Sequence, residues 1–382
     1  MRSEQISWNE GSGWRSGHGA VGLANLVFYF GTRQALACGA RYDELRLKFP
    51  GAHLLGCSTG GQIRNDDVTD DDIAGLALGF DRTALRLATA TVAGSASSRA
   101  CGESMGRALA QTDGDKLKAI FVLSDGLNIN GSELVAGIAA VVGNGVALTG
   151  GMAGDGALFE ETLVGGDGPP RTHQVAAVGF YGDAVRIGHG SAGGWDEFGP
   201  RRRISRAEGN VLYELDGKPA LDLYKRYLGD EADGLPGTAL LFPLRICDPN
   251  DPDNELVRTV LAVDHDTRSM TFAGDMPEGW VAQLMRGNLD RLALGAADAA
   301  RQAAADIGAR NGVAILVSCI GRRLLMGQRA TEEVEAAGSE LGRGMPRLGF
   351  YSYGEIAPHH AMGECQLHNQ TMTVTVISET DG

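Results

Sequence analysis

Three similar glycine-rich turns, at residues 56–63, 150–155 and 349–356, restrict the folds that this chain can adopt. Before each turn, an apolar run, a polar loop, a stretch with helical spacing and a second apolar run follow one another. A short edge-type strand is expected after each turn, and a helix near 280–305 is expected before the third unit. This repeated order predicts an α/β fold with mixed sheets, built as two related lobes from strand–helix–strand units.

The ends of the pattern suggest the domain boundaries. The first residues, 1–24, are rich in glycine, serine and charge, and we expect them to form a flexible N-terminal arm. A later helix should begin at Pro219 and end before Gly229, because proline favours the first turn of a helix and glycine its end. We therefore expect an N-terminal domain over 25–218 and a C-terminal domain over 219–382.

Composition excludes several classes of protein. The chain contains 56 glycines among 382 residues, whereas glycine usually makes up about 7% of a protein. A formal net charge of −14 repels nucleic acids and anionic lipids, so we expect neither as a partner. There is no apolar run of 18 residues to span a membrane, and the polar N-terminus lacks the apolar core of a secretory signal. A cytoplasmic location, with the six scattered cysteines reduced, is the expected setting.

Several motifs carry a resemblance to a known family. The segments GCSTGGQI, GGMAGD, ELDGKPALDLYKRYLG, SCIGRR, GFYSYGEIAP and LHNQTMT resemble the FIST (F-box and intracellular signal transduction) proteins, which are bacterial sensory proteins. The resemblance covers about residues 25–378 and keeps the order of the motifs. It implies a sensor rather than an enzyme, with a small ligand and a role in signal transduction such as two-component regulation.

The resemblance also implies a partner and a cofactor. Because the FIST match leaves only short ends, the signal is expected to pass to a separate histidine kinase, diguanylate cyclase or chemotaxis-type protein. One branch of the family is similar to haem-binding nitric-oxide sensors. The segments GHGSAGGWDEFGP and HNQTMTVT resemble that branch, which implies haem b as a cofactor.

The three turns are the expected place for the ligand, because α/β proteins usually bind ligands at the ends of their strands. The turns match no nucleotide-phosphate motif. The alternative is that their glycines serve only tight turns in a compact fold. The expected ligand-binding residues lie in or beside the turns and the matching motifs: Cys57, Ser58, Thr59, Gly60, Asp155, Cys319, Arg322, Tyr351, Tyr353, Glu355 and Asn369.

Two histidines are candidate axial ligands of the haem iron, which commonly takes a neutral histidine. His189 should lie at a strand end between Gly188 and Gly190, where a flat ligand could approach. The arginines at 201–203 could pair with the haem propionates. His368 should begin the final strand and is the second candidate. The alternative for both is an ordinary histidine in a loop or at the surface.

Three other readings stay open. A haem-free sensor would hold an amino acid or another small metabolite through hydroxyl and backbone groups. An enzyme could use Cys57 or Cys319 as a nucleophile, although no motif places a base beside either thiol. The histidines and cysteine between His359 and His368 have the composition of a zinc site, but their spacing matches no zinc finger.

Overall fold

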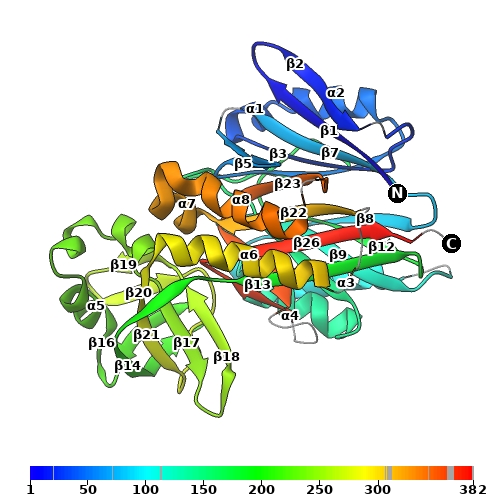
Figure 1. Cartoon of the computed structure of the whole chain (residues 1–382). Coiled ribbons are helices and arrows are strands. Elements are labelled where there is room, and N and C mark those ends of the chain that lie inside the picture. The colour runs from blue at the N-terminus through cyan, green and yellow to red at the C-terminus, as the bar shows by residue number, and fades with distance from the viewer. Residues whose placement is uncertain are drawn as a thin grey trace.

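The computed structural model describes residues 1–19, 21–70, 72–111, 114–305, 307, 312–342, 344–358 and 365–380. Over this part of the chain, three six-stranded sheets and their helices form a body, and an eight-stranded sheet forms a separate β-subdomain beside it (Figure 1). The sheets of the body mix parallel and antiparallel strands. The predicted α/β class, with mixed sheets and two lobes, is therefore confirmed.

The first sheet has the order β11-β4-β3-β7-β1-β2. Its strands are β1 (Arg2–Asn9), β2 (Gly13–Gly19), β3 (Leu26–Gly31), β4 (His53–Ser58), β7 (Ile73–Gly79) and β11 (Val164–Gly166). The apolar run of β3 is buried throughout, as expected for a strand covered on both faces. It pairs with β4 in parallel and with β7 antiparallel. Helices α1 (Arg33–Ala37) and α2 (Ala40–Lys48) connect β3 to β4 and are separated at Gly39, whose φ is +73°.

The prediction of a flexible N-terminal arm is wrong. Strand β1 pairs with β7 from Arg2 to Trp8, and β2 folds back onto β1. The side chain of Ile6 is buried against the body, which explains why this polar segment is held in the sheet. Strand β1 has few apolar residues, so the alternation of inward and outward side chains that identifies a strand is weak in its sequence. Pairing with β7 determines its structure.

The second and third sheets repeat the plan of the first. The second contains β8 (Ala84–Thr91), β9 (Leu117–Ser124), β10 (Ala147–Met152), β12 (Gln174–Tyr181), β24 (Gly354–Pro358) and β25 (Cys365–His368), with helices α3 (Ser98–Ala110) and α4 (Gly131–Val142). The third contains β5 (Gln62–Arg64), β6 (Asp67–Thr69), β13 (Val185–Ala192), β22 (Gly312–Cys319), β23 (Arg347–Ser352) and β26 (Met372–Glu379), with helices α6 (Leu289–Ala305), α7 (Ile320–Met326) and α8 (Ala330–Leu341). In each sheet a parallel pair, β9/β10 or β22/β23, is flanked by an antiparallel strand, β12 or β26.

The three units exchange strands after their glycine turns. Strand β5 leaves the first unit and pairs with β23 of the third. Strand β24 leaves the third unit and pairs with β10 of the second. Strand β11 leaves the second unit and pairs with β4 of the first. The repeated unit that the sequence predicts therefore forms a closed ring of three sheets, and each glycine turn is a crossing point between two of them.

Aromatic side chains from the three sheets fill the centre of the body. The rings of Phe28 and Phe121 lie 5.1 Å apart, and those of Phe30 and Phe350 lie 4.5 Å apart. All four side chains are buried. Edge-to-face and tilted contacts of this kind add to the free energy gained by burying the rings, so the core ties together strands that are distant in the sequence.

The β-subdomain comprises residues 195–287. It contains β14 (Trp195–Glu208), β15 (Val211–Leu215), β16 (Lys218–Pro219), β17 (Leu244–Asp248), β18 (Asp251–Arg258), β19 (Val260–Asp264), β20 (Ser269–Phe272) and β21 (Val281–Gly287), with helix α5 (Ala220–Leu228) and short 3-10 turns at Gly229–Gly234 and Gly237–Leu241. Further 3-10 turns in the body span Ser95–Ser97 and Gly327–Arg329. The boundary expected between residues 218 and 219 falls within β16, which pairs with β15.

The helix expected near 280–305 is shorter than predicted. Residues 281–287 form strand β21, which pairs with both β14 and β17, and the helix begins at Leu289. Ala282 and Leu284 are both buried, and their spacing of two residues matches the two-residue period of a strand. Pairing on both sides therefore overrides the helical reading of this segment.

Candidate functional site

The three glycine turns meet in the body, as the sequence predicts. The amide of Gly154 donates to the carbonyl of Ser58 at 2.9 Å, and the amide of Gly60 donates to the carbonyl of Tyr351 at 2.8 Å. The amide of Tyr353 donates to the carbonyl of Met152 at 3.3 Å. Each turn thus bonds to both of the others. We call this region, residues 58–61, 150–155 and 351–354, the glycine knot.

Close backbone contact explains the glycines of the knot. A Cβ atom at Gly150 would lie 1.9 Å from the carbonyl oxygen of Val122, and one at Gly60 would lie 2.5 Å from the side chain of Ile320. Gly150 also has a φ of +143°, which side-chain-bearing residues rarely adopt. These glycines let the turns pack closely against other segments of the same chain. This agrees with the alternative that the glycines serve tight turns in a compact fold.

The polar side chains of the knot are buried and bond to one another or to the backbone. The Asp155 carboxylate accepts from the amides of Phe159, Glu160 and Glu161, each at 3.0 Å, and from the Tyr353 hydroxyl. Ser58 Oγ accepts from the Leu163 amide at 2.9 Å. These groups hold the turns in place, and their hydrogen bonds leave them poorly placed to meet a ligand.

Other predicted ligand residues lie in the same interior. The side chains of Thr59, Tyr351 and Asn369 are buried, and Thr59 Oγ1 donates to the carbonyl of Gly31 at 3.3 Å. The Tyr351 hydroxyl donates to the carbonyl of Ala330 at 3.5 Å. These residues lie in or beside the glycine turns, as the sequence predicts. Their side chains are buried among other protein groups and do not face an open cleft.

The two candidate thiols are not activated. Cys57 and Cys319 are buried, and burial raises the pKa of each thiol above its ordinary value. For Cys319, the nearby Glu355 carboxyl raises the pKa further, and Arg322 only partly opposes it. A thiol needs to be deprotonated to act as a nucleophile, so neither cysteine has the environment that the enzyme reading requires.

The predicted ligand residue Arg322 has its guanidinium bonded to other groups of the protein. It forms a buried ion pair with Glu333, whose Oε2 lies 2.8 Å from Nη2. Its nitrogens also donate to the carbonyls of Gly193 at 2.7 Å and Leu292 at 2.8 Å. Ser318 Oγ donates to the other Glu333 oxygen at 2.9 Å. The pair braces helices α7 and α8 against the start of α6 and the chain that enters the β-subdomain.

Glu355 is the most perturbed carboxyl of the interior. It accepts from Ser352 Oγ at 2.7 Å, from the Thr371 amide at 3.1 Å and from Thr371 Oγ1 at 2.9 Å. Complete burial outweighs these hydrogen bonds and raises the pKa of Glu355 to about 8. Its protonation therefore changes near neutral pH.

The prediction that His189 lies at the end of a strand is wrong. His189 lies within β13 and pairs with Thr375, and successive residues of a strand point to opposite faces. Gly188 and Gly190 therefore face away from the imidazole and contact helix α6, where a Cβ atom would lie 2.0–2.1 Å from carbonyl oxygens of the helix. The glycines allow α6 to pack closely and make no room beside the histidine.

The sequence predicts that His368 begins the final strand. In the structure it is instead the last residue of the short strand β25. It is buried, and its Nε2 lies 3.0 Å from the carbonyl oxygen of Ala357. A carbonyl only accepts, so this nitrogen carries the proton and has no lone pair for a metal. The predicted partners of the haem propionates lie elsewhere, since Arg202 in the β-subdomain pairs with Asp216 and Tyr227.

Haem b does not fit these residues as they are placed. The cavity beside His368 has a volume of 230 Å³, below the range of about 300–1,000 Å³ usual for ligand pockets. Among the described residues, no three His, Cys, Asp or Glu side chains cluster as metal ligands. The proposed zinc ligands His359 and His360 lie outside the described residues.

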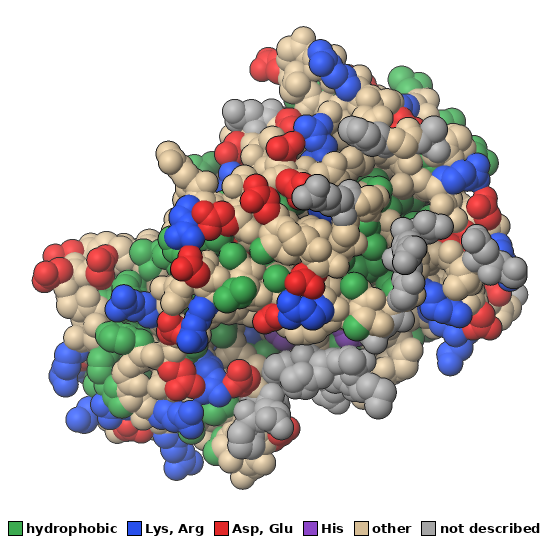
Figure 2. Space-filling model, in the orientation of Figure 1, with side chains coloured by type: hydrophobic (Ala, Val, Ile, Leu, Met, Phe, Trp, Pro, Cys, Tyr) green, Lys and Arg blue, Asp and Glu red, His purple; other side chains and the backbone are tan. Residues whose placement is uncertain are grey.

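Two cavities open between the body and the β-subdomain, and we call them together the interlobe cleft. The larger, of 370 Å³, is lined by Ser132, Ala136, Ala139, Ala140, Asn144, Leu256, Arg258, Asp275, Pro277, Cys365, Gln366 and Leu367. The smaller, of 230 Å³, is lined by Ser191–Trp195, Arg245, Glu255–Val257, Met285, His368 and Thr371. Leu256 borders both. In Figure 2, histidine atoms are visible near the place where the two parts of the molecule meet.

Sequence reasoning missed the cleft residues Ser132, Arg258 and Asp275. They belong to no glycine turn and lie far apart in the chain, on α4, at the end of β18 and in the loop before β21. Only the packing of the β-subdomain on the body brings them together. His368 and Thr371, from a motif that the sequence did single out, reach the edge of the smaller cavity.

The comparison with known families divides the chain near residue 219, inside the β-subdomain. A model of the FIST N domain matches residues 25–218, and a model of the FIST C domain matches residues 220–358. The chain belongs to the FIST family. FIST domains have a small-ligand sensory role in signal transduction, and this role therefore applies to the chain.

Other comparisons of this FIST protein add little. No curated protein matches the chain. Among solved structures, a crystal structure of a chorismatase is similar over 98% of both chains, with 10% sequence identity and a TM-score of 0.34, which is too low to support an argument. None of the helices in the described ranges has the length and apolar character needed to cross a membrane.

Proposed function

We propose that this FIST protein senses a small polar metabolite that binds, without haem, in the interlobe cleft. The observation that carries the proposal is the position of the cleft, whose walls come from both the body and the β-subdomain. Ser132 and Leu367 belong to the body, and Leu256 and Arg258 belong to the β-subdomain. A ligand there touches both parts and can shift the equilibrium between two arrangements of them.

The chain path fits such a shift. The β-subdomain is joined to the body where the chain enters at Gly193–Trp195 and where it leaves at Gly287–Asn288. These two crossings lie side by side, because Trp195 pairs with Gly287. The carbonyl of Gly193 accepts from Arg322, so the crossings are connected to the buried ion pair of the body. A change in the cleft thus has a direct route to helices α7 and α8.

The output is proposed to be a separate partner protein in the cytoplasm. The six cysteines are unpaired, which suits a reducing compartment. A histidine kinase, diguanylate cyclase or chemotaxis-type protein remains the proposed class of partner. An enzyme that uses Cys57 or Cys319 is the weaker proposal, because both thiols are buried and protonated.

A blocking variant tests the site. Ala140 is exposed at the rim of the larger cavity, so Ala140→Trp should fill the opening without disturbing the core. Leu294→Trp, at an exposed position of α6, adds the same side chain elsewhere and is the matched control. A library of small metabolites should raise the melting temperature of the wild type and the control. Equal shifts in Ala140→Trp would contradict a site in the cleft.

A visible spectrum separates this proposal from the haem version. The protein should be produced with haem supplied, and a haem complex would show a Soret band. The proposal predicts no such band in stoichiometric amount. A band that disappears in His189→Ala or His368→Ala would instead support the haem-based nitric-oxide sensor and identify its axial ligand.

A further inference from the structure

We propose that the guanidinium of Arg258 binds a carboxylate group of the sensed molecule, in the larger cavity of the interlobe cleft. This inference rests on the proposed function and adds the chemical class of the ligand. It depends on two buried polar groups that line the cavity, Arg258 from the β-subdomain and Ser132 from the body.

Arg258 is a buried cation, and one of its three nitrogens, Nη2, has no acceptor among the described residues. Its side chain is 3% exposed. Its Nε donates to the carbonyl of Asp275 at 3.1 Å, and its Nη1 donates to the carbonyl of Leu367 at 2.8 Å. Among the described residues, no group accepts from Nη2, and no carboxylate lies within 4.0 Å of the guanidinium. A buried charge without a counter-ion is costly, and a carboxylate is the anion that matches the planar guanidinium.

The charge of Arg258 persists in this setting. Burial lowers the pKa of Arg258 to about 10, and the negative charge of Asp275 opposes this effect. The guanidinium therefore stays protonated at neutral pH. It is a permanent positive charge in the wall of a cavity that is large enough for a small organic molecule.

Ser132 supplies the second donor. It is the second residue of helix α4, and its Oγ is buried without a hydrogen-bond partner among the described residues. A Cβ atom at Gly274 would lie 3.0 Å from Ser132 Oγ and 3.0 Å from the Arg258 guanidinium carbon. The two groups thus border the same small space, which Gly274 leaves open. The first turn of a 12-residue helix also favours negative charge.

Asp275 limits the charge of the ligand. It lines the same cavity, and its Oδ1 accepts from Asn130 Nδ2 at 2.8 Å. The Asp275 carboxylate does not pair with Arg258, but its negative charge in the same cavity would repel a dianion more than a monoanion, so the site favours a single carboxylate over a phosphate dianion. Ala136, Ala139 and Ala140 form a small apolar wall on α4, which suits a short carbon chain.

The experiment uses the full chain and defined probes. Sodium acetate, L-lactate, butyrate and L-alanine are compared with the amides of the same acids and with sodium chloride and sodium sulfate. Binding is followed by thermal shift and isothermal titration. We expect at least one of the acids to bind, and its amide to bind about tenfold or more weakly because the amide has no charge for Arg258.

Three variants assign the effect to residues. Ser132→Ala removes one donor and should weaken binding of the acid by about tenfold. Arg258→Lys keeps the charge but loses the fork of nitrogens, and it should weaken binding by about a hundredfold. Arg268→Lys, at an exposed position of the β-subdomain, is the control and should bind like the wild type. If Arg258→Lys is unstable, Ser132→Ala alone decides the assignment.

Failure of this inference differs from failure of the proposed function. If the amides bind as well as the acids, or if only neutral or cationic metabolites from a library bind and Ala140→Trp blocks them, the carboxylate assignment is wrong and the sensor in the cleft stands. If acids bind with equal affinity to wild type and Ser132→Ala, the assignment is also wrong. If no small molecule binds, both proposals fail.

Discussion

The glycine knot and the interlobe cleft differ in what their sequences display and in what their structures offer. The knot contains parts of three of the six motifs that resemble FIST proteins, yet its polar side chains are buried and bonded to one another or to the backbone. The larger cavity of the cleft has few motif residues, yet it is lined by a buried arginine whose Nη2 has no described acceptor. A recurrent motif can therefore reflect the packing of the chain, and a candidate ligand site can lie in a region that no sequence motif identifies.

The glycines show why a structural turn is easily mistaken for a ligand site in the sequence. A missing side chain permits a ligand to approach the backbone, and it equally permits another strand or helix to do so. At Gly150 the approaching atom is a carbonyl oxygen of β9, and at Gly188 it is a carbonyl oxygen of α6. Only the fold tells which of the two uses applies. Four experiments test this contrast, and they are given from the largest expected effect to the smallest.

Gly150→Ala should damage the knot most severely. The new methyl group would overlap the Val122 carbonyl, and alanine is strained at a φ of +143°. We expect a loss of about 5 kcal/mol in the free energy of unfolding, or failure to fold. Urea denaturation measures the change, and Gly145→Ala, which has open space around it, is the control. A stable Gly150→Ala variant would mean that the knot is looser than described.

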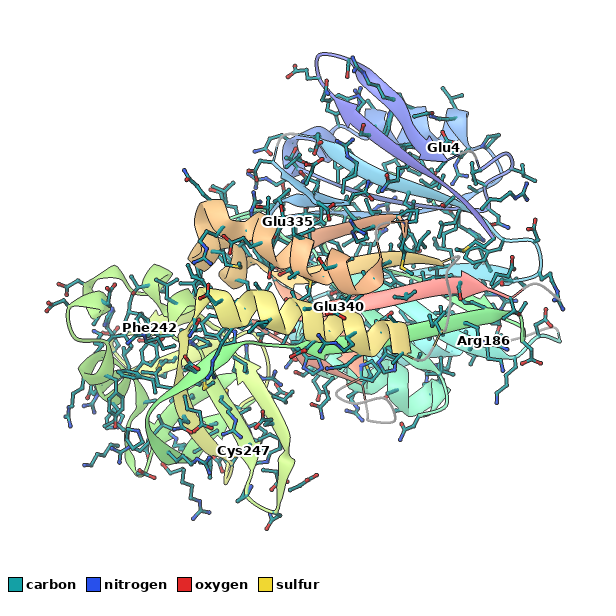
Figure 3. The ribbon with its side chains drawn as sticks, viewed as in Figure 1. Glu4, Arg186, Phe242, Cys247, Glu335 and Glu340 are labelled. Atoms are coloured by element: carbon teal, nitrogen blue, oxygen red, sulfur yellow. The ribbon has the colours of Figure 1, made fainter. Side chains whose placement is uncertain are left out.

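Glu333→Gln should be the next most harmful change. It leaves the buried Arg322 guanidinium without its counter-charge, which typically costs about 3–5 kcal/mol. Glu335→Gln is a suitable control, since Glu335 lies on the same helix and is exposed; Figure 3 shows it on α8. Chemical denaturation of the two variants gives the comparison. Equal stabilities would show that Arg322 finds compensation elsewhere and is not a structural brace.

Glu355→Gln tests, through pH, the buried carboxyl that adjoins the knot and bonds to Ser352. The pKa of Glu355 is about 8 in the folded protein and near 4.3 in an unfolded chain, so the folded state retains a proton that the unfolded state has lost between these values. The contribution of Glu355 to stability is therefore present below about pH 4 and falls as the pH rises towards 8. Glutamine does not titrate. The stability of Glu355→Gln relative to wild type should thus increase by roughly 2–4 kcal/mol from pH 5 to pH 8. A difference that is constant with pH would contradict the raised pKa.

Ser132→Ala should have the smallest effect on stability. Its hydroxyl is buried without a described partner, so removing it should change the free energy of unfolding by less than about 1 kcal/mol. The same change should weaken ligand binding. Thermal denaturation without ligand and titration with the acids separate the two effects. A large loss of stability would mean that Ser132 belongs to the structural framework, like the serines of the knot.

Much of the fold was predictable. The apolar runs expected before the turns form β3, β9 and β22, and the stretches with helical spacing form α2, α4 and α8, because local periodicity identifies buried strands and amphipathic helices. The convergence of the three turns was also predictable from their common place after a second strand. The N-terminal strands β1 and β2, and strand β21, were not, because pairing with distant strands determines them.

Less of the candidate site could be predicted. The location of Ser58, Thr59 and Asp155 was predicted, but not that their hydrogen bonds are internal. The opposite orientations of His189 and its glycines follow from strand geometry, once β13 is known to run through this segment. Arg258 had no signal, since an isolated arginine at a strand end is ordinary until the elements around it are placed.

The sequence alone determined the family, the repeated unit and the three turns, because these depend on residue order and on short-range periodicity. The tertiary structure alone decided which glycines pack against backbone, which charges are paired and where a cavity remains. These properties depend on contacts between residues such as Ser132 and Arg258, which are distant in the chain. The physical reason is that burial and pairing are set by all the elements that surround a group, and no local pattern contains that information.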